Sequence, residues 1–223
     1  MINKKEEAEK GLKETSRLEA FSDGVFSIAI TILVLELIEM LHIQHNEGLL
    51  KAYLNNWESF LAFCIGFCTI LICWINHHHV FTYINKVDNT LLWVNGFVLF
   101  AVTITPLPTA ILAEYLEKEG NTALAVFGVN YLMISIASYC ISAYVYNKFL
   151  IEEDSRDFFN CIKLTYKYSI FYTLFALIVC FISIPVAIVL YLGLFCAFAT
   201  PKKFASLIFK MKNSGKKKLK NQN

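Results

Sequence analysis

The side chains best able to do chemistry stand at the start of the first apolar segment. Arg17, Phe21, Ser22 and Asp23 precede a run from Gly24 to Leu35 that is almost purely apolar. A guanidinium and a carboxylate at the edge of a lipid core are costly unless they have partners. The pattern therefore predicts a transmembrane helix whose polar end is buried in an assembly.

Helical geometry divides this segment into faces. A helix turns by about 100° per residue, so with Ile28 as the origin Ile32 falls at about 40°, Leu35 at about 340°, Thr31 at about 300° and Glu39 at about 20°. These residues form one stripe, with Glu39 at its outer end. Asp23 falls at about 220° and Ser22 at about 120°, away from the stripe. Arg17 falls at about 340°, on the stripe side, where an unpaired cation would repel other cations.

Ordinary helix packing explains many aliphatic stripes, and spacing alone does not decide against it. If several copies of the helix surround one axis, however, rings of branched aliphatic side chains form a narrow constriction. Thr31 then adds a ring of hydroxyl oxygens. Glu39 places a ring of carboxylates at the outer mouth, where it concentrates cations. In this interpretation Asp23 does not touch the permeating ion but fixes the helix through a buried polar network.

Three consecutive histidines, His77, His78 and His79, end the second apolar segment. Adjacent residues do not share a helix face, so the three imidazoles cannot bind one metal ion in a regular helix. We therefore predict no metal site and no cofactor, and expect interfacial or hydrogen-bonded histidines instead. Asn95, on the third segment, is a plausible partner for this cluster.

Composition and charge define the class and the topology. The chain has 223 residues, 57% of them hydrophobic, and a mean hydropathy of +0.52, which is typical of a membrane protein. Six segments are apolar enough to span a bilayer. They are 17–42, 56–80, 89–116, 122–150, 161–183 and 185–205. Pro185 divides the last two, and Pro106 and Pro108 are expected to kink or loosen the third.

Six spans with both termini in the cytoplasm place 18 of the 20 Lys and Arg residues inside, as the positive-inside rule predicts. The basic tail is expected to lie against anionic headgroups rather than on nucleic acid. No extramembrane segment reaches the size of a folded domain.

The order Arg-x-x-x-Phe-Ser-Asp followed by Ile-Ala-Ile-Thr-Ile-Leu-Val-Leu-Glu resembles the signature helix of the transmembrane protein 175 family. That family comprises potassium-permeable channels of prokaryotes and of endolysosomes. The resemblance implies that Ile28, Ile32 and Leu35 form the pore constriction and that Thr31 contributes to potassium preference. It also implies that His77 joins the network of Arg17, Phe21, Ser22 and Asp23.

In that family, prokaryotic members with one repeat are homotetramers, so the resemblance and the single motif imply a homotetramer with four copies of the first helix around the axis, in the plasma membrane of a prokaryote. We expect a cytoplasmic N-terminus at 1–16, an all-α six-helix channel domain at 17–205 and a basic cytoplasmic tail at 206–223. The partners implied are potassium ions and membrane lipid.

Two other classes compete with a channel. A secondary transporter of cations or small solutes is favoured mildly by the prolines, but the carboxylates lie near the ends of spans rather than at the midplane. A membrane enzyme is disfavoured because no nucleophile–base pair, phosphate loop or carboxylate dyad is present. The Thr-Val-Gly-Tyr-Gly filter of other potassium channels is also absent from the sequence, so the potassium prediction depends on the hydrophobic rings and the resemblance.

Overall fold

The computed structural model describes residues 2–42, 48, 50, 51, 54, 56–84, 86–148 and 153–200. The side chains of residues 2–13 and 39–42, and a few later ones, are not described. The predicted tail at 206–223 therefore lies outside the described residues. The described regular elements are all helical, and their bounds are Ile2–His42 (α1), Trp57–Phe81 (α3), Asn89–Ile104 (α4), Pro106–Lys148 (α5), Glu153–Cys180 (α6) and Ile184–Ala199 (α7).

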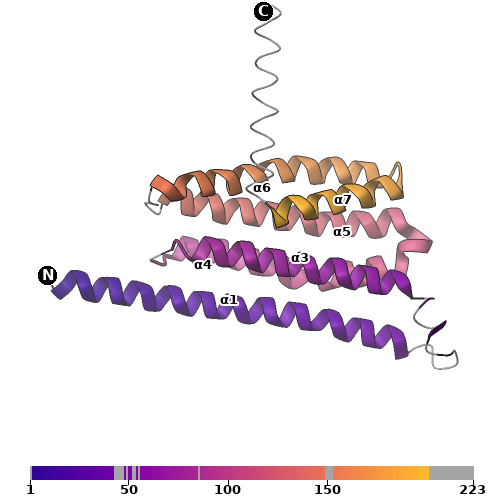
Figure 1. Ribbon diagram of the computed structural model, residues 1–223, viewed down its shortest axis with the longest axis horizontal. Helices are drawn as coiled ribbons and strands as arrows, with labels where there is room; N and C mark the ends of the chain where they lie inside the picture. Colours follow the sequence, from indigo (N-terminus) through magenta and orange to yellow (C-terminus); the bar gives the residue numbers. More distant parts are fainter. Residues whose placement is uncertain are drawn as a thin grey trace, which may run out of the picture.

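The helices run side by side as a bundle with α1 at one edge (Figure 1). α3 and α4 lie next to α1, and the second half of α5 lies with α6 and α7 on the far side of the bundle. Two apolar clusters hold these layers together. The first joins α1, α3 and α4 to the second half of α5 and includes Phe26, Leu33, Ile70 and Val102. The second joins α5, α6 and α7 and includes Phe127 and Tyr191.

The third predicted span is interrupted where its prolines are. α4 ends at Ile104 and α5 begins at Pro106, because proline has no N–H to continue the hydrogen-bonded ladder. α5 then continues through the predicted boundary between the third and fourth spans. It bends there at Glu119, where φ is −137° and ψ is 46°. The third crossing is therefore built from α4 and the first part of α5, and the rest of α5 returns.

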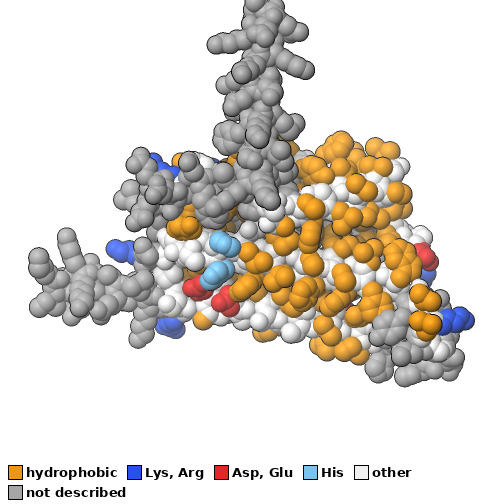
Figure 2. Space-filling view, in the orientation of Figure 1, with side chains coloured by type: hydrophobic (Ala, Val, Ile, Leu, Met, Phe, Trp, Pro, Cys, Tyr) orange, Lys and Arg blue, Asp and Glu red, His pale blue; other side chains and the backbone are white. Residues whose placement is uncertain are grey.

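The lengths of these helices suit a membrane. Of the residues described, four stretches are long and apolar enough to cross one: Glu14–Ile38, Trp57–Phe81, Asn89–Lys148 and Ile162–Cys180, with the shorter Ile184–Cys196 in addition. The stretch Asn89–Lys148 has 60 residues, about 90 Å at 1.5 Å per residue, which is enough for two crossings of a ~30 Å hydrocarbon core. Much of the surface is correspondingly hydrophobic (Figure 2).

A close contact between three helices positions α1. A methyl group added at Gly66 of α3 would come within 2.9 Å of Thr109 Oγ1 on α5 and 3.2 Å of Leu33 on α1. Only the absence of a side chain at Gly66 lets these helices approach so closely. α1 also starts earlier than the predicted span, at Ile2, so its polar N-terminal part continues the same helix.

Candidate functional site

α1 has a buried face and an uncovered face. Ser22, Phe26, Ala29 and Leu33 are at most 2% exposed and pack against α3, α4 and α5. The predicted stripe lies on the other side: Ile28 is 61% exposed, Ile32 37% and Leu35 64%, and Thr31 is exposed as well. The stripe therefore lies on the exposed side of α1, and Ile32 is the most covered of its three aliphatic residues. The side chain of Glu39, at the outer end of the stripe, lies outside the described residues.

Thr31 is satisfied within its own helix. Its hydroxyl donates to the carbonyl oxygen of Ile28 at 2.9 Å. The hydroxyl oxygen keeps its lone pairs on the uncovered face, so it remains able to accept a hydrogen bond or approach a cation.

A buried chain of hydrogen bonds joins α1, α3 and α4. Asn95 of α4 donates from Nδ2 to Ser22 Oγ at 3.0 Å, and its Oδ1 lies 2.7 Å from His77 Nε2. Ser22 Oγ in turn donates to the carbonyl oxygen of Leu18 at 2.8 Å. Because Asn95 Oδ1 can only accept, His77 carries its proton on Nε2. The ring of His77 also stacks on Phe81 and contacts Phe26.

Asp23 lies outside this chain and has a partner that the sequence analysis missed. The indole Nε1 of Trp74 donates to Asp23 Oδ1 at 2.8 Å, which ties α1 to α3 a second time. The sequence of α3 shows only that Trp74 and His78, four residues apart, share one face of that helix. Their rings stack, and His78 Nδ1 lies 3.2 Å from Glu19 Oε1 of α1.

The three histidines diverge, as their spacing predicts. His77 points into the bundle toward Asn95, His78 faces Glu19, and His79 Nδ1 meets the carbonyl oxygen of Ile75 in its own helix. Figure 2 shows histidines beside carboxylates at this end of the molecule. Among the described residues, no three His, Cys, Asp or Glu side chains are grouped closely enough to hold a metal ion.

Arg17 and Phe21 lie outside the hydrogen-bonded network and line a cleft instead. The cleft has a volume of about 540 Å³ and separates the polar end of α1 from the loop before α4. Its remaining lining residues are Glu14, Leu18, Val87, Asp88, Asn89 and Leu92. The guanidinium thus shares the cleft with two carboxylates. Phe21 is 64% exposed, so the most apolar residue of the motif is largely uncovered.

Asp88 is a second polar anchor that the sequence analysis did not identify. It caps α4 by accepting from the backbone N–H of Leu91, and it also accepts from Tyr144 Oη and lies 3.0 Å from Lys148 Nζ. The hydrogen bond from Tyr144, followed by that from Leu91 and the contact with Lys148, lowers the pKa of Asp88 to about 2. An ionised Asp88 therefore joins the start of α4 to the end of α5.

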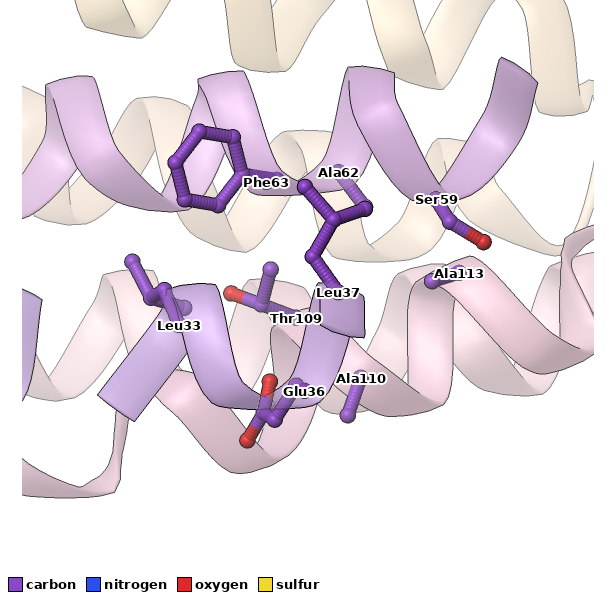
Figure 3. A pocket seen from close by; sticks show the side chains of 9 residues that line it. All are labelled: Leu33, Glu36, Leu37, Ser59, Ala62, Phe63, Thr109, Ala110 and Ala113. Atoms are coloured by element: carbon purple, nitrogen blue, oxygen red, sulfur yellow. The ribbon is translucent and has the colours of Figure 1, made fainter. Parts of the chain in front are cut away.

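A small gap lies where α1, α3 and α5 meet, lined by Glu36 together with small and apolar side chains (Figure 3). Its volume is about 10 Å³, room for about one water molecule. A gap of this size is a packing detail of the three-helix contact, not a substrate site.

These features define a multi-pass α-helical membrane protein whose first helix joins a buried polar network on one side to an exposed aliphatic stripe on the other. Residues 17–106 match the family model for the endosomal/lysosomal potassium channel TMEM175. The chain also resembles the crystal structure of a lysosomal potassium-selective channel TMEM175 homologue from Chamaesiphon minutus. That match has a TM-score of 0.71 and 34% identity, and covers 84% of this chain and 97% of the other. The chain belongs to the TMEM175 family.

Two curated relatives each match about half of this chain. A potassium channel of Chamaesiphon minutus is 46% identical over 125 residues, which is 55% of this chain and 62% of the relative. The endosomal/lysosomal proton channel TMEM175 of Gallus gallus is 31% identical over 117 residues, 49% of this chain and 23% of the relative. The matched region thus spans less than two thirds of the length of these curated relatives.

Proposed function

We propose that this protein is the subunit of a potassium-permeable, cation-selective channel, with α1 of each subunit lining the pore. The observation that carries the proposal is the uncovered aliphatic stripe on α1 in a chain of this family. The relatives named as potassium channels support the choice of ion. A pore of this kind performs no catalysis. The role of each subunit is to position the residues of α1 around the path that the ions follow.

The stripe supplies the constriction. Four copies of Ile28, Ile32 and Leu35 form three rings of branched hydrocarbon, which narrow the path and make it easy to dewet. Cations that cross such rings must lose part of their hydration, so a weakly hydrated ion crosses more readily than a strongly hydrated one. Thr31 contributes hydroxyl oxygens between these rings, and the Glu39 ring raises the cation concentration at the outer mouth.

The assembly and its placement follow from the same arrangement. One copy of α1 cannot enclose a pore, so several subunits related by a closed symmetry are needed, and the family resemblance favours four. Both termini are cytoplasmic and the membrane is a prokaryotic plasma membrane, with the exposed faces of α6 and α7 in contact with lipid. The hydrogen bonds among Ser22, Asn95 and His77, together with the separate bond from Trp74 to Asp23, then lie at the inner mouth and hold α1 in place.

Planar-bilayer recording of the purified protein tests the proposal. With a K⁺/Na⁺ gradient, the reversal potential is expected to move toward the K⁺ equilibrium potential, and openings are expected as unitary current steps. A slow, saturable and coupled flux without steps would instead indicate a transporter. A pH gradient across the same bilayer reports whether protons carry the current, as the name of the avian relative raises.

Substitutions in the stripe test its role. Ile28→Asn, Ile32→Asn and Leu35→Asn are each expected to change conductance or the reversal potential, because a polar ring hydrates the constriction. Ile178→Asn is the matched control: Ile178 is 64% exposed, close to the 61% of Ile28, but it belongs to α6, which lies across the bundle from α1 (Figure 1). The pore assignment fails if all three stripe variants conduct like wild type.

A further inference from the structure

Two lysines stand in the first turns of a membrane span, and the proposed pore does not use them. Lys163 and Lys167 belong to α6, whose stretch Ile162–Cys180 is long and apolar enough to cross a bilayer. An ammonium group at the edge of the hydrocarbon is costly unless an anion neutralises it, so an ionisable group inside a span marks a candidate binding site. Among the residues that the structure describes, no carboxylate forms an ion pair with either lysine.

The two side chains are placed to reach one ligand. Lys163 is half-buried, and its Nζ lies 4.8 Å from the centroid of the Tyr146 ring on α5. The aromatic face attracts the ammonium group and fixes it beside α5, but accepts no conventional hydrogen bond from it, so its N–H donors remain usable. Lys167, four residues later, is exposed. Residues four apart are neighbours on a helix surface, so both ammonium groups can donate to the oxygens of one phosphate.

The lysines are also the charges of α6 that lie nearest to its apolar part. The acidic residues Glu153, Asp154 and Asp157 belong to the first turns of this helix. Asp157 precedes Lys163 by six residues, about 9 Å along the helix axis, and so lies farther from the hydrocarbon. Where α6 enters the apolar layer its charge is therefore positive, which suits an anionic group at that level.

An exposed apolar face continues from the lysines along α6. With Phe171 as the origin, Lys167 falls at about 320° and Lys163 at about 280°. The large exposed side chains that follow fall between about 300° and about 40°, and they are Phe171, Leu174, Phe175 and Ile178. From Lys167 to Ile178 the helix rises by about 16 Å, close to one leaflet of a ~30 Å hydrocarbon core. The face thus has the length of an acyl chain below a basic site.

We propose that Lys163 and Lys167 bind the headgroup of an anionic phospholipid whose acyl chain lies along this exposed face of α6. Two ammonium groups favour a headgroup with net negative charge over a zwitterionic one, because the latter brings no net charge to neutralise them. The site lies across the bundle from α1 (Figure 1). It requires the chain to span a membrane but does not depend on which ion α1 conducts.

Photolabelling of the full chain in nanodiscs of phosphatidylcholine tests the site. The probe is a trace of phosphatidylglycerol with a photoreactive acyl chain, and the readout is the label on α6 divided by the label on α7. α7 is the internal reference, because it exposes Val186 and Val189 but contains no Lys or Arg. The ratio should be about 20–30 times larger than with a phosphatidylcholine probe, since each lysine near the surface contributes a factor of about five.

Lys163→Gln combined with Lys167→Gln should lower the phosphatidylglycerol ratio to that of phosphatidylcholine. Lys167→Gln alone changes only an exposed side chain and should lower the ratio about five-fold, so it decides the matter even if the double variant misfolds. Lys167→Arg keeps the charge and should keep the ratio. Lys118→Gln, at an exposed lysine of α5 outside the site, is the control and should leave the ratio unchanged.

Equal ratios for the two lipid probes would overturn the proposal, as would a phosphatidylglycerol ratio that Lys167→Gln leaves unchanged. Loss of the label in excess inorganic phosphate would show that the lysines take a free phosphate group, and would overturn the lipid as the occupant. Each of these results leaves the proposed pore untouched, because the reversal potential tests α1 separately.

Discussion

Replacing Asn95 by leucine is expected to destabilise the protein more than any other single change in the polar network. Asn95 is 1% exposed and is the only described residue that connects Ser22 of α1 with His77 of α3. Leucine has the same number of side-chain heavy atoms with the same branching, so the change removes hydrogen bonds and opens no space. The cost is therefore electrostatic in origin and does not come from a cavity.

The magnitude follows from what each partner loses. A hydrogen bond between membrane helices is worth only about 0.6 kcal/mol on average, so two such bonds give about 1 kcal/mol. Leaving a buried donor unpaired costs more, about 1–3 kcal/mol for each group. His77 is the vulnerable partner, because its Nδ1 already has no hydrogen bond within the described structure and the substitution would also strip Nε2. Ser22 still donates to Leu18. The expected total is about 2–4 kcal/mol.

Reversible unfolding in mixed micelles measures this free energy. Thr103→Val is the control on the same helix: it removes a hydroxyl that only donates to the backbone of its own helix, and it should cost less than about 1 kcal/mol. In a cycle with Ser22→Ala, the double variant should lose less than the sum of the two single variants. A cost for Asn95→Leu below about 1 kcal/mol, or equal to that of Thr103→Val, would refute the reasoning.

Three further outcomes are expected. Asp23→Ala and Trp74→Phe each remove the same α1–α3 hydrogen bond, so each should lower the free energy of unfolding by about 1–2 kcal/mol and reduce the yield of the assembly. The reversal potential should stay unchanged, and an intact channel with altered selectivity would contradict this. Gly66→Ala should destabilise by about 1–3 kcal/mol because its methyl group meets Thr109, and Thr109→Ala in the same chain should restore part of the loss in a thermal melt. Asp88 has a lowered pKa, so the stability it contributes is complete above about pH 4 and is lost as the pH falls toward 2. After screening of this partly exposed carboxylate, the free energies of unfolding of wild type and Asp88→Asn should differ by about 1 kcal/mol at neutral pH and become equal in acid. A difference that persists at pH 2 would contradict this prediction.

Helical period and proline chemistry made much of the bundle predictable from the sequence. The two faces of α1 follow from the 3.6-residue period, and the interruption at Thr105 follows from Pro106. The divergence of His77 and His78 follows from their being adjacent on a helix. Each of these features is local, so a single segment of sequence contains the information.

The partners of the polar side chains were less predictable, because a helical angle gives a direction but not the neighbour in that direction. We expected Asp23 to bond to another helix, yet nothing in its own segment identifies Trp74, which is 51 residues away. Asp88 was missed for the same reason, since Tyr144 and Lys148 reach it from the far end of α5. The bend at Glu119 lies in the predicted gap between the spans 89–116 and 122–150, so what was not predicted is that one helix continues through that gap.

The two attachments of α1 have a consequence for the pore that neither would have alone. Ser22 and Asp23 are about 100° apart on the helix and bind different neighbours, Asn95 of α4 and Trp74 of α3. Bringing Ile32 to the axis in place of Ile28 requires α1 to roll by about 40°. At a side-chain radius of about 5 Å, that roll moves each polar atom by about 3–4 Å. Hydrogen bonds weaken well before such a displacement, so both would break. The polar motif therefore fixes the rotation of α1 more finely than the angular spacing between Ile28 and Ile32. In the proposed channel, groups that do not face the ion path would thus determine which side chains do.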